Sequence, residues 1–356
     1  MICQNHLRER VVRTKHLSAR LRRRFRQEQS IYPPAYAGGS DKKNMSAATF
    51  SNGWLNFELN VLRRLKFTSV ALPFTGEPNL GTQLKRWQVR VAANDPMGWS
   101  FTKSTATVEN NSESLSAAEI ESVLEDAYVP RERLDNPSLL NRFNETDAWW
   151  FDNVRFNAER LDTNYKRCLA LTLGMMVGDY VRSFGDESRH LRAPLSLSGI
   201  FRQLWETFPA PCDNSMQNRA SNQDVRSFVA ERRHTDLMFL RLPSPIELQP
   251  PQQSLAGWRE EWLLGGDDFW DEVEKTRAGK LGSRVQSKQQ YLGFVEDLLH
   301  TAAHIPIWAI ALTENGFISN EELVDTIERV RKVDAIYSKD FSDLLGVRAA
   351  IITAES

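Results

Sequence analysis

The sequence predicts an α/β fold in which a mostly parallel sheet carries helices on both faces and a helical insertion. Short apolar runs alternate with segments of helical periodicity, which is the pattern of parallel strands joined by crossover helices. The clearest run, Thr235 to Leu240, leads into Pro243 and Pro245, and a strand ends there because proline cannot donate to a β-ladder. Another run is followed by a loop that carries Gly76. Ligands of open α/β sheets bind at such strand ends, so both stretches are candidate site segments.

The composition is that of a globular protein that can bury a large core. Of the 356 residues, 41% are hydrophobic and 26% are charged, and no apolar run approaches the roughly 18 residues of a membrane helix. The opening residues lack the apolar segment of a secretory signal. The three cysteines, Cys3, Cys168 and Cys212, are far apart in the sequence, which favours neither a disulfide framework nor a zinc cage. We therefore expect a cytoplasmic, intracellular protein without bound metal or membrane contact.

Charge is distributed unevenly between a basic arm and an acidic body. Residues 1–44 hold eleven Lys/Arg against three Asp/Glu, and the rest of the chain holds 34 against 43. Like-charge blocks are usually disordered interaction tails, so we expect a disordered arm and linker that can contact DNA phosphates. An alternative is that translation starts at Met45, in which case the arm is not part of the natural protein. The candidate DNA-binding residues are Arg20, Arg22, Arg23, Arg24 and Arg26.

The part that follows the arm has the pattern of a nucleotide-binding half-sheet. An amphipathic helix is predicted over residues 56–66, and strands are predicted over residues 68–72 and 88–93. A strand, a glycine-bearing turn such as that at Gly76 and a helix bring backbone N–H groups to a nucleotide-like ligand. Asp95 follows the second strand, where an acid can accept hydrogen bonds from both ribose hydroxyls. The alternative is that local backbone groups satisfy Asp95.

The middle of the chain is predicted to be helical. Ser116 followed by Glu119 is a capping box, and residues 149–185 have helical periodicity with an apolar section that must be buried. Aromatic side chains at the start of this segment can stack on nucleic-acid bases, although such clusters more often belong to a core. Scattered arginines can line a phosphate path or a solvated face. The aromatic residues are Trp149, Trp150, Phe151 and Phe156, and the arginines are Arg182, Arg189, Arg192 and Arg202.

The last part of the chain predicts further strand and helix units. Asp224 precedes a helix over residues 225–233, which it can cap. Residues 247–284 are rich in Pro, Gln, Gly and Trp and are expected to form an irregular insertion beside the strand end. His300 and His304 are four residues apart on a helix, but no Glu follows His300 as in zinc proteases, which favours a surface or core role. A helix is predicted over residues 291–304, and a second capping box is predicted at Ser319. Strands are predicted over residues 305–312, 335–337 and 347–353.

The order of these segments resembles the Dam-like class of DNA adenine-N6 methyltransferases. In that class an apolar strand runs into the sequence Asp-Pro-Pro-Tyr, and the first loop resembles Asp-Pro-Phe-x-Gly-x-Gly. The second strand of the class often ends in Asn-Asp, as does the strand before Asp95 here. The residues that correspond to the first motif are Arg241, Leu242, Pro243 and Ser244, and those that correspond to the loop include Leu72, Pro73, Phe74, Gly76 and Pro78.

The resemblance implies a methyltransferase-like sheet of the Rossmann type and S-adenosylmethionine as the possible cofactor. Pro78 stands where the class has a glycine and Leu72 where it has an acid, so we expect binding to be weak or absent, because proline offers no N–H. The implied cofactor-binding residues are Phe74, Gly76, Asp95 and Asp224. The implied parts are a cofactor-binding half over residues 45–112, a helical insertion for DNA or partner recognition over 113–221, and a catalytic-like half over 222–356.

The catalytic motif that the resemblance implies is degenerate. In the class, an acid or amide accepts hydrogen bonds from the target amine, and an aromatic ring stacks on the flipped base. Arg241 has donors only, and Ser244 offers no stacking face. Because losing one preorganised group commonly costs about 100- to 1000-fold, the loss of both should leave little turnover.

We therefore expect a pseudoenzyme, a catalytically degenerate DNA adenine-N6 methyltransferase-like protein that acts as a DNA-binding or protein-partner-binding subunit. Two alternatives stay open. One is an active S-adenosylmethionine-dependent DNA adenine methyltransferase with a non-standard catalytic loop. The other is a structural component of a protein assembly, which would fit the acidic body.

Overall fold

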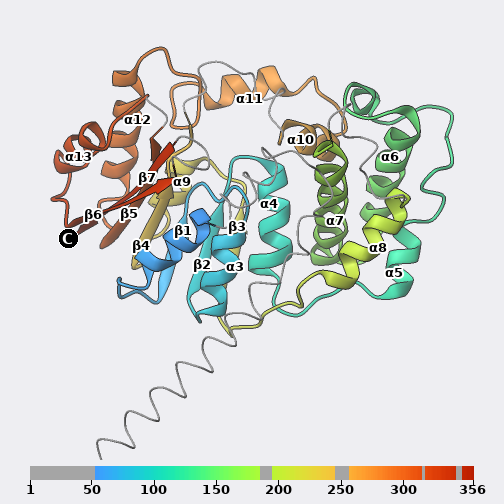
Figure 1. The fold of residues 1–356 in the computed structure, drawn as a ribbon, viewed down its shortest axis with the longest axis horizontal. Coiled ribbons are helices and arrows are strands. Elements are labelled where there is room, and N and C mark those ends of the chain that lie inside the picture. Colours follow the sequence, from blue (N-terminus) through green and yellow to red (C-terminus); the bar gives the residue numbers. More distant parts are fainter. Residues whose placement is uncertain (1–52, 185–194, 245–255, 315–316, 342–346) are drawn as a thin grey trace, which may run out of the picture.

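The structure is a computed structural model that describes residues 53–184, 195–244, 256–314, 317–341 and 347–356. These residues form a seven-stranded sheet with a group of helices beside it (Figure 1). The strands lie in the order β3-β2-β1-β4-β5-β7-β6. Their bounds are β1 Ser69–Leu72, β2 Arg90–Asn94, β3 Arg219–Ser221, β4 Leu237–Arg241, β5 Ile307–Glu314, β6 Ala335–Phe341 and β7 Val347–Glu355.

Among the described strands, β7 alone runs against the others. Strands β1 to β5 pair in parallel, whereas β7 pairs antiparallel with both β5 and β6. The predicted α/β class with a mostly parallel sheet is therefore confirmed. From β1 the chain builds the sheet outward to β2 and β3, and it then returns to place β4 on the other side of β1. Open α/β sheets bind their ligands at the carboxyl ends of the strands beside such a reversal.

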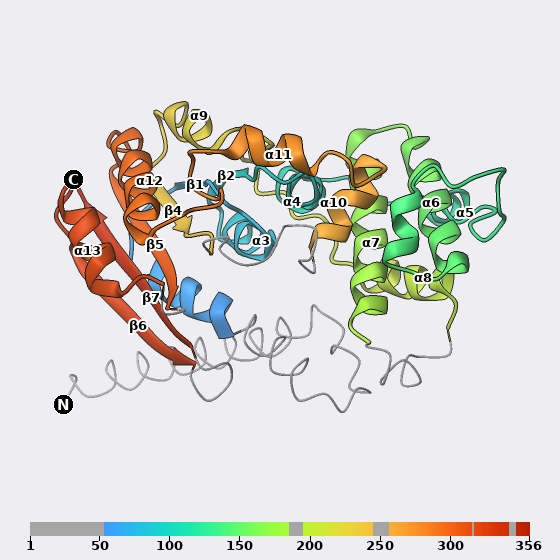
Figure 2. The same cartoon turned by 90° about the horizontal axis from the view of Figure 1, so that it is seen from above.

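Helices cover both faces of the sheet, because successive residues of a buried strand point to opposite faces. In β4, Leu237 and Phe239 belong to the core shared with α3, whereas Met238 and Leu240 belong to the core shared with α9 and α12. Figure 2 shows α3 on one side of the strands and α9 and α12 on the other. The helices on the two faces span residues 53–62, α3 Asn79–Arg86, α9 Val225–Ala230, α12 Lys288–Thr301 and α13 Asn320–Glu328.

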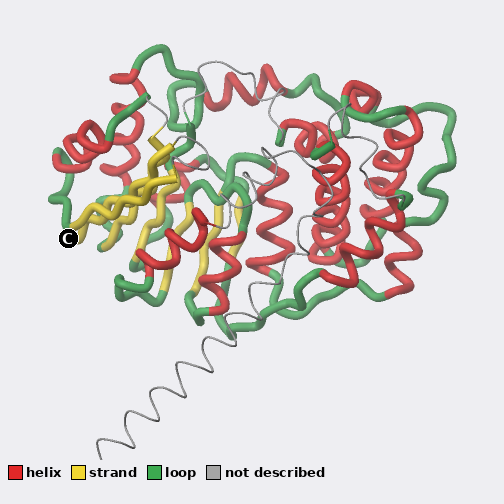
Figure 3. The backbone as a smooth tube through the Cα atoms, in the orientation of Figure 1, coloured by secondary structure: helices red, strands yellow, loops and turns green. Residues whose placement is uncertain are grey.

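A third core joins the helices beside the sheet, which Figure 3 shows as a separate group of coils. Two glycines of α7 make room for the indole rings of α10, which follows β4 in the chain. A Cβ atom at Gly174 would overlap the ring of Trp262, and one at Gly178 would overlap the ring of Trp258. The elements are α4 Gly98–Ser104, the π-helix η1 Thr105–Glu109, α5 Ala117–Val123, the 3-10 helix η2 Pro137–Asn141, α6 Glu145–Glu159, α7 Asn164–Arg182, α8 Leu197–Thr207 and α10 Gly257–Leu264.

Both predicted capping boxes are confirmed, at Ser116 in front of α5 and at Ser319 in front of α13. The helical prediction for residues 149–185 is confirmed for most of their described length, which α6 and α7 cover, and the side chain of Thr163 caps α7 after the break between them. The irregular insertion predicted over residues 247–284 is wrong for its described part, which contains α10 and α11 Trp270–Arg277. In the described ranges, no helix has the length and apolarity to cross a membrane.

The two glycines of α7 generate a stability prediction. Gly178→Ala should lower the free energy of unfolding by about 1–3 kcal/mol, because the new methyl group meets the buried ring of Trp258 in a packed core. The matched control is Gly293→Ala in α12, where nothing lies within 4 Å of the added Cβ. There the loss of backbone freedom in the unfolded chain should add about 0.5–1 kcal/mol.

Urea denaturation of the two variants and the parent protein measures both changes. Equal stability of Gly178→Ala and Gly293→Ala would show that the packing of Trp258 does not depend on the groove along α7, the surface that Gly174 and Gly178 leave open.

Candidate functional site

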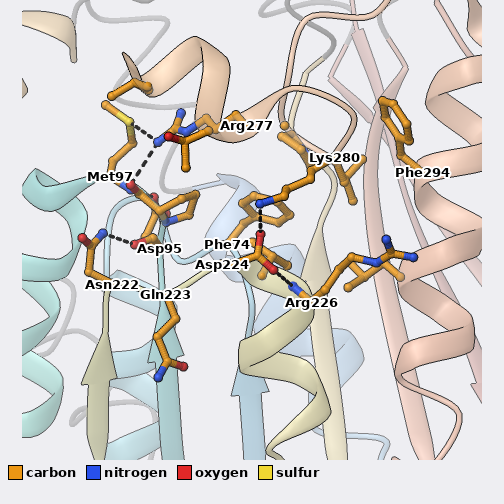
Figure 4. Close-up of a pocket in the computed structure, with 18 of the residues that line it drawn as sticks. Phe74, Asp95, Met97, Asn222, Gln223, Asp224, Arg226, Arg277, Lys280 and Phe294 are labelled. Carbon is orange, nitrogen blue, oxygen red and sulfur yellow. Dashed lines mark hydrogen bonds and ion pairs between the residues drawn. The ribbon is translucent and has the colours of Figure 1, made fainter. Parts of the chain in front are cut away.

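A cavity of about 650 Å³ lies at the carboxyl ends of β1, β2 and β4, where the strand order reverses. This volume is within the range of roughly 300–1,000 Å³ that small-molecule sites occupy. Its walls include all four residues predicted to bind a cofactor, and Figure 4 shows Phe74, Asp95 and Asp224 around it. The other residues of interest along its wall are Gly76, Arg241, Leu242 and Pro243.

The first loop is tied to the end of β2. The backbone N–H of Gly76 donates to Oδ2 of Asp95 over 2.8 Å, and that of Thr75 donates to the carbonyl of Asn94 over 2.9 Å. Gly76 has a φ of +56°, a left-handed conformation that glycine adopts at low cost. The loop therefore does point a backbone N–H toward the strand-end acid, but within the chain that N–H is already used.

Asp95 is nearly buried, with 7% of its surface exposed. Burial raises the pKa of this carboxyl group, although hydrogen bonds from the backbone N–H groups of Gly76 and Met97 and the nearby charge of Arg277 act in the opposite direction. The bond from Met97 is 2.9 Å long and reaches Oδ1, so each carboxylate oxygen holds one backbone group. Local backbone groups therefore do satisfy Asp95, as the alternative interpretation expected, and the residue also lines the cavity.

Asp224 caps α9, as its position before the helix predicts. Its Oδ1 accepts from the backbone N–H groups of Arg226 over 3.1 Å and Ser227 over 3.2 Å, and its Oδ2 pairs with Nζ of Lys280 at 3.0 Å. Partial burial acts to raise the pKa of Asp224, but the Lys280 ion pair and the backbone bonds outweigh it and lower the pKa. Asp224 therefore enters the cavity wall as a carboxylate that already has a cation beside it.

Sequence reasoning did not single out Asn94 as a site residue, although its side chain joins the strand ends. Its Nδ2 donates to the carbonyls of Pro73 and Gln223, each over 3.2 Å, and its Oδ1 accepts from the backbone N–H of Gln223 over 3.0 Å. Asn222 adds a bond of 2.7 Å from its side chain to the carbonyl of Asp95. A polar residue at the end of a buried strand was the available signal, because a buried amide needs several partners.

Arg241 at the end of β4 is engaged with the chain itself. Its Nε and Nη2 donate to the two carboxylate oxygens of Glu58, each over 2.7 Å, and its Nη1 donates to the carbonyls of Thr75 over 2.9 Å and Glu77 over 3.4 Å. Glu58 is fully buried, and Arg241 keeps 23% of its side chain exposed. The carboxylate holds the pKa of Arg241 above its usual value despite the effect of burial. The fork geometry of guanidinium and carboxylate makes this a strong, oriented pair.

The residues after Arg241 are also fixed. The backbone N–H of Leu242 donates to the carbonyl of Ala311 over 3.0 Å, and the hydroxyl of Tyr291 donates to the carbonyl of Pro243 over 2.7 Å. Burial raises the pKa of Tyr291, so this hydroxyl stays a donor. Ser244, the residue expected to correspond to a stacking aromatic, is exposed and is not part of the cavity wall.

Leu72 and Pro78, the two residues that were expected to weaken cofactor binding, have structural roles. Leu72 is buried at the end of β1 and lies against Gly81 of α3, where an added Cβ would be 3.3 Å from Cδ1 of Leu72. Pro78 occupies the position before the first turn of α3, and its carbonyl accepts from the backbone N–H of Thr82 over 2.9 Å. Neither residue lines the cavity.

A segment that follows α10 forms the roof of the cavity, and we call residues 265–282 the cap segment. It contains α11, which lies above the strand ends in Figure 1. Arg277 donates to the carbonyl of Pro96 over 3.0 Å and to Sδ of Met97 over 2.8 Å, next to Asp95. Lys280 reaches Asp224, so the cap segment sets one cation beside each of the two strand-end acids (Figure 4).

A group of charges connects the first loop with the helices beside the sheet. Glu77 pairs with Lys103 at 2.9 Å and with Arg259 at 2.7 Å, and Arg259 also holds both oxygens of Asp179 at 2.9 and 2.6 Å. The two cations lower the pKa of Glu77 although burial acts to raise it. Arg259 also stacks on Trp99, 4.6 Å from the ring centroid. This group links the first loop, α4, α7 and α10, so it is a structural support of the cavity wall.

The remaining candidate residues do not join the cavity. Trp150 and Phe151 are buried in the helical core, as the commoner interpretation of such clusters predicts, and Trp149 is also buried. Phe156 is 46% exposed and stacks with Arg131. Arg202 pairs with Glu121. No group of His, Cys, Asp or Glu within the described ranges could hold a metal, and His300 lies beside Glu296. Seven of the candidate residues lie outside the described ranges: Arg20, Arg22, Arg23, Arg24, Arg26, Arg189 and Arg192.

Comparison with known proteins adds no relative: no protein-family model matches this sequence, and no curated protein is significantly similar to it.

The Arg241 pair generates the second prediction. Arg241→Met should lower the free energy of unfolding by about 3–5 kcal/mol, because it leaves the Glu58 carboxylate buried without a partner. The double variant Glu58→Leu/Arg241→Met should recover most of this loss, since it leaves no buried charge. The matched control is Arg226→Met, whose ion pair with Asp297 is half exposed and whose loss should change stability by less than about 0.5 kcal/mol.

Chemical denaturation of these variants in a double-mutant cycle gives the coupling between Glu58 and Arg241. A double variant that is as unstable as Arg241→Met alone would show that the pair does not explain the burial of Glu58.

Proposed function

We propose that this protein is a methyltransferase-like pseudoenzyme that keeps a nucleoside-type cavity but does not transfer methyl groups, and that it acts as a DNA-binding or partner-binding subunit. The observation that carries the proposal is the position of Arg241, whose guanidinium holds Glu58 and the carbonyl of Thr75 at the end of β4. If the resemblance to the Dam-like class holds, this is the place where the class presents an acceptor to the target amine. A guanidinium has no acceptor.

The sheet supports the methyltransferase-like part of the proposal. The order β3-β2-β1-β4-β5, with β6 beyond it, is that of a doubly wound nucleotide-binding sheet, into which the reversed strand β7 is inserted. The cavity lies where that architecture binds its ligand, and Asp95 and Asp224 enter its wall from the end of β2 and the start of α9. Such acids can accept from the ribose hydroxyls and from the adenine amino group of a nucleoside.

The loss of transfer follows from two independent absences at the motif. The acceptor is replaced by Arg241, and the stacking ring is replaced by Ser244, which is exposed outside the cavity wall. Each preorganised group of this kind contributes about 100- to 1000-fold to a rate. The acids of the cavity wall and the helices beside the sheet can still bind a ligand or a partner, and the sheet holds them in place.

The proposal predicts that the purified protein transfers no labelled methyl group from S-adenosylmethionine to adenine in duplex DNA above the level of a heat-denatured sample. It also predicts that S-adenosylmethionine binds more weakly than the micromolar range, because the strand-end acids already hold backbone groups and lie beside cations. Calorimetry measures the affinity, and a dissociation constant of 1 μM corresponds to about −8 kcal/mol.

Two results would count against this prediction in different ways. Methyl transfer would support the alternative of an active enzyme with a non-standard catalytic loop. Micromolar binding without transfer would keep the pseudoenzyme and show that the cofactor site is in regular use.

DNA binding, which the proposal includes, should depend on the basic arm, because the chain from residue 45 onward holds 34 basic against 43 acidic residues. If about four phosphates are neutralised, the logarithm of the affinity should fall with the logarithm of the salt concentration with a slope near −3.6. A protein that starts at Met45 should lose this slope and most of the affinity in a fluorescence-anisotropy titration with duplex DNA.

The control is a full-length variant with Arg20, Arg22, Arg23, Arg24 and Arg26 changed to Gln, which keeps the length of the arm and removes its charge. Equal affinity and slope for the full and shortened chains would assign DNA binding to the helices beside the sheet. Absence of binding by either chain would leave a protein partner as the target.

A further inference from the structure

We propose that the cap segment competes with ligands for the cavity. Arg277 and Lys280 occupy the positions beside Asp95 and Asp224 that donor groups of a ligand would take. A ligand therefore binds only after the C-terminal end of the cap segment, which carries these two cations, has moved. The inference rests on the proposed function, because it takes the ligand to be of nucleoside type. It adds that the cavity is regulated by the chain itself and that two residues of the cap set its affinity.

Arg277 is held beside Asp95 by charge rather than by a matched acceptor. Its Nη2 donates to the carbonyl of Pro96 and to the thioether sulfur of Met97, which is a weak acceptor. The negative charges around it are those of Asp95 and Glu260, and Glu260 is itself occupied by the backbone N–H groups of Gly98 and Trp99, each over 2.8 Å. A cation without a bidentate carboxylate is less costly to displace than Arg241, which has one.

Lys280 is the easier of the two cations to displace. Its Nζ lies 3.0 Å from Oδ2 of Asp224, and the side chains are 39% and 31% exposed. Ion pairs with this exposure contribute little to stability, since water can replace either partner. A ligand amine that donates to Asp224 would therefore exchange one weak contact for another, and it would gain the apolar contacts of the cavity in addition.

The two ends of the cap segment differ in how they are attached. At one end the ring of Trp270 is buried, and its Nε1 donates to Oε1 of Glu261 over 3.2 Å. At the other end Gly279 and Gly282 have φ values of +76° and +90°. Nothing lies within 4 Å of the position of a Cβ at Gly279, whereas a Cβ at Gly282 would be 3.3 Å from Phe74. The end that carries the two cations can thus move while the Trp270 end stays anchored.

The test compares the full chain with the variant Arg277→Ala/Lys280→Ala, and Lys275→Ala is the matched control. Lys275 lies on the same helix, and its ion pair with Glu272 is three-quarters exposed. The probe is S-adenosylhomocysteine, which has the nucleoside but no transferable methyl group. By calorimetry the double variant should bind it at least tenfold more tightly than the full chain, and Lys275→Ala should bind it as the full chain does.

A second measurement needs no ligand. Backbone hydrogen exchange over residues 270–282 should be at least tenfold faster in the double variant and unchanged in Lys275→Ala, because the two cations hold this end of the cap. If the double variant does not fold, since Asp95 and Glu260 lose their shared cation, the single variant Lys280→Ala decides. It should bind the probe about threefold more tightly and exchange faster over residues 278–282.

The outcomes separate the inference from the function on which it rests. Equal affinities of the full chain and the variants would overturn the inference and support the nucleoside site. Unchanged exchange in the variants would also overturn it, because the cations would not hold the cap. Faster exchange without any binding of the probe would show that the two cations hold the cap segment, and it would overturn the proposal that the cavity binds a nucleoside-type ligand.

Discussion

The buried pair of Glu58 and Arg241 is the interaction on which the site depends. A guanidinium at the end of the central strand must be neutralised, and the neutralising carboxylate comes from a helix 183 residues earlier in the chain. The same guanidinium holds the carbonyls of Thr75 and Glu77 in the first loop. One charge thus sets the relative positions of helix 53–62, the first loop and β4.

The parts of the fold that the sequence predicted have local signals. The capping boxes at Ser116 and Ser319 each lie within four residues, and apolar runs mark the long strands. Parallel strands bring their carboxyl ends to one edge, which is why Asp95 and Asp224 line one cavity although they are far apart in the sequence. The three-residue strand β3 was missed because so short a run has no detectable period.

What could not be predicted depends on pairs that are distant in the sequence. Nothing near Arg241 in the sequence indicates that Glu58 is its partner, so the structural role of this arginine could not be predicted. The predicted irregular insertion was wrong because Pro, Gln and Gly dominate its composition, whereas the helix α10 gains its stability from burying Trp258 and Trp262 against α7. Tertiary packing of this kind overrides local propensity.

The groove along α7 has a consequence for how the protein can be divided. Because Gly174 and Gly178 receive tryptophans from α10, which follows β4, the group of helices is completed by a piece of chain that is made only after the central strand. A fragment that ends before residue 257 would leave a strip of apolar helix in water, and such surfaces promote association. The helices beside the sheet are therefore not a removable insert: in a chain synthesised from its N-terminus, their core closes after β4 exists, which couples the folding of the two regions.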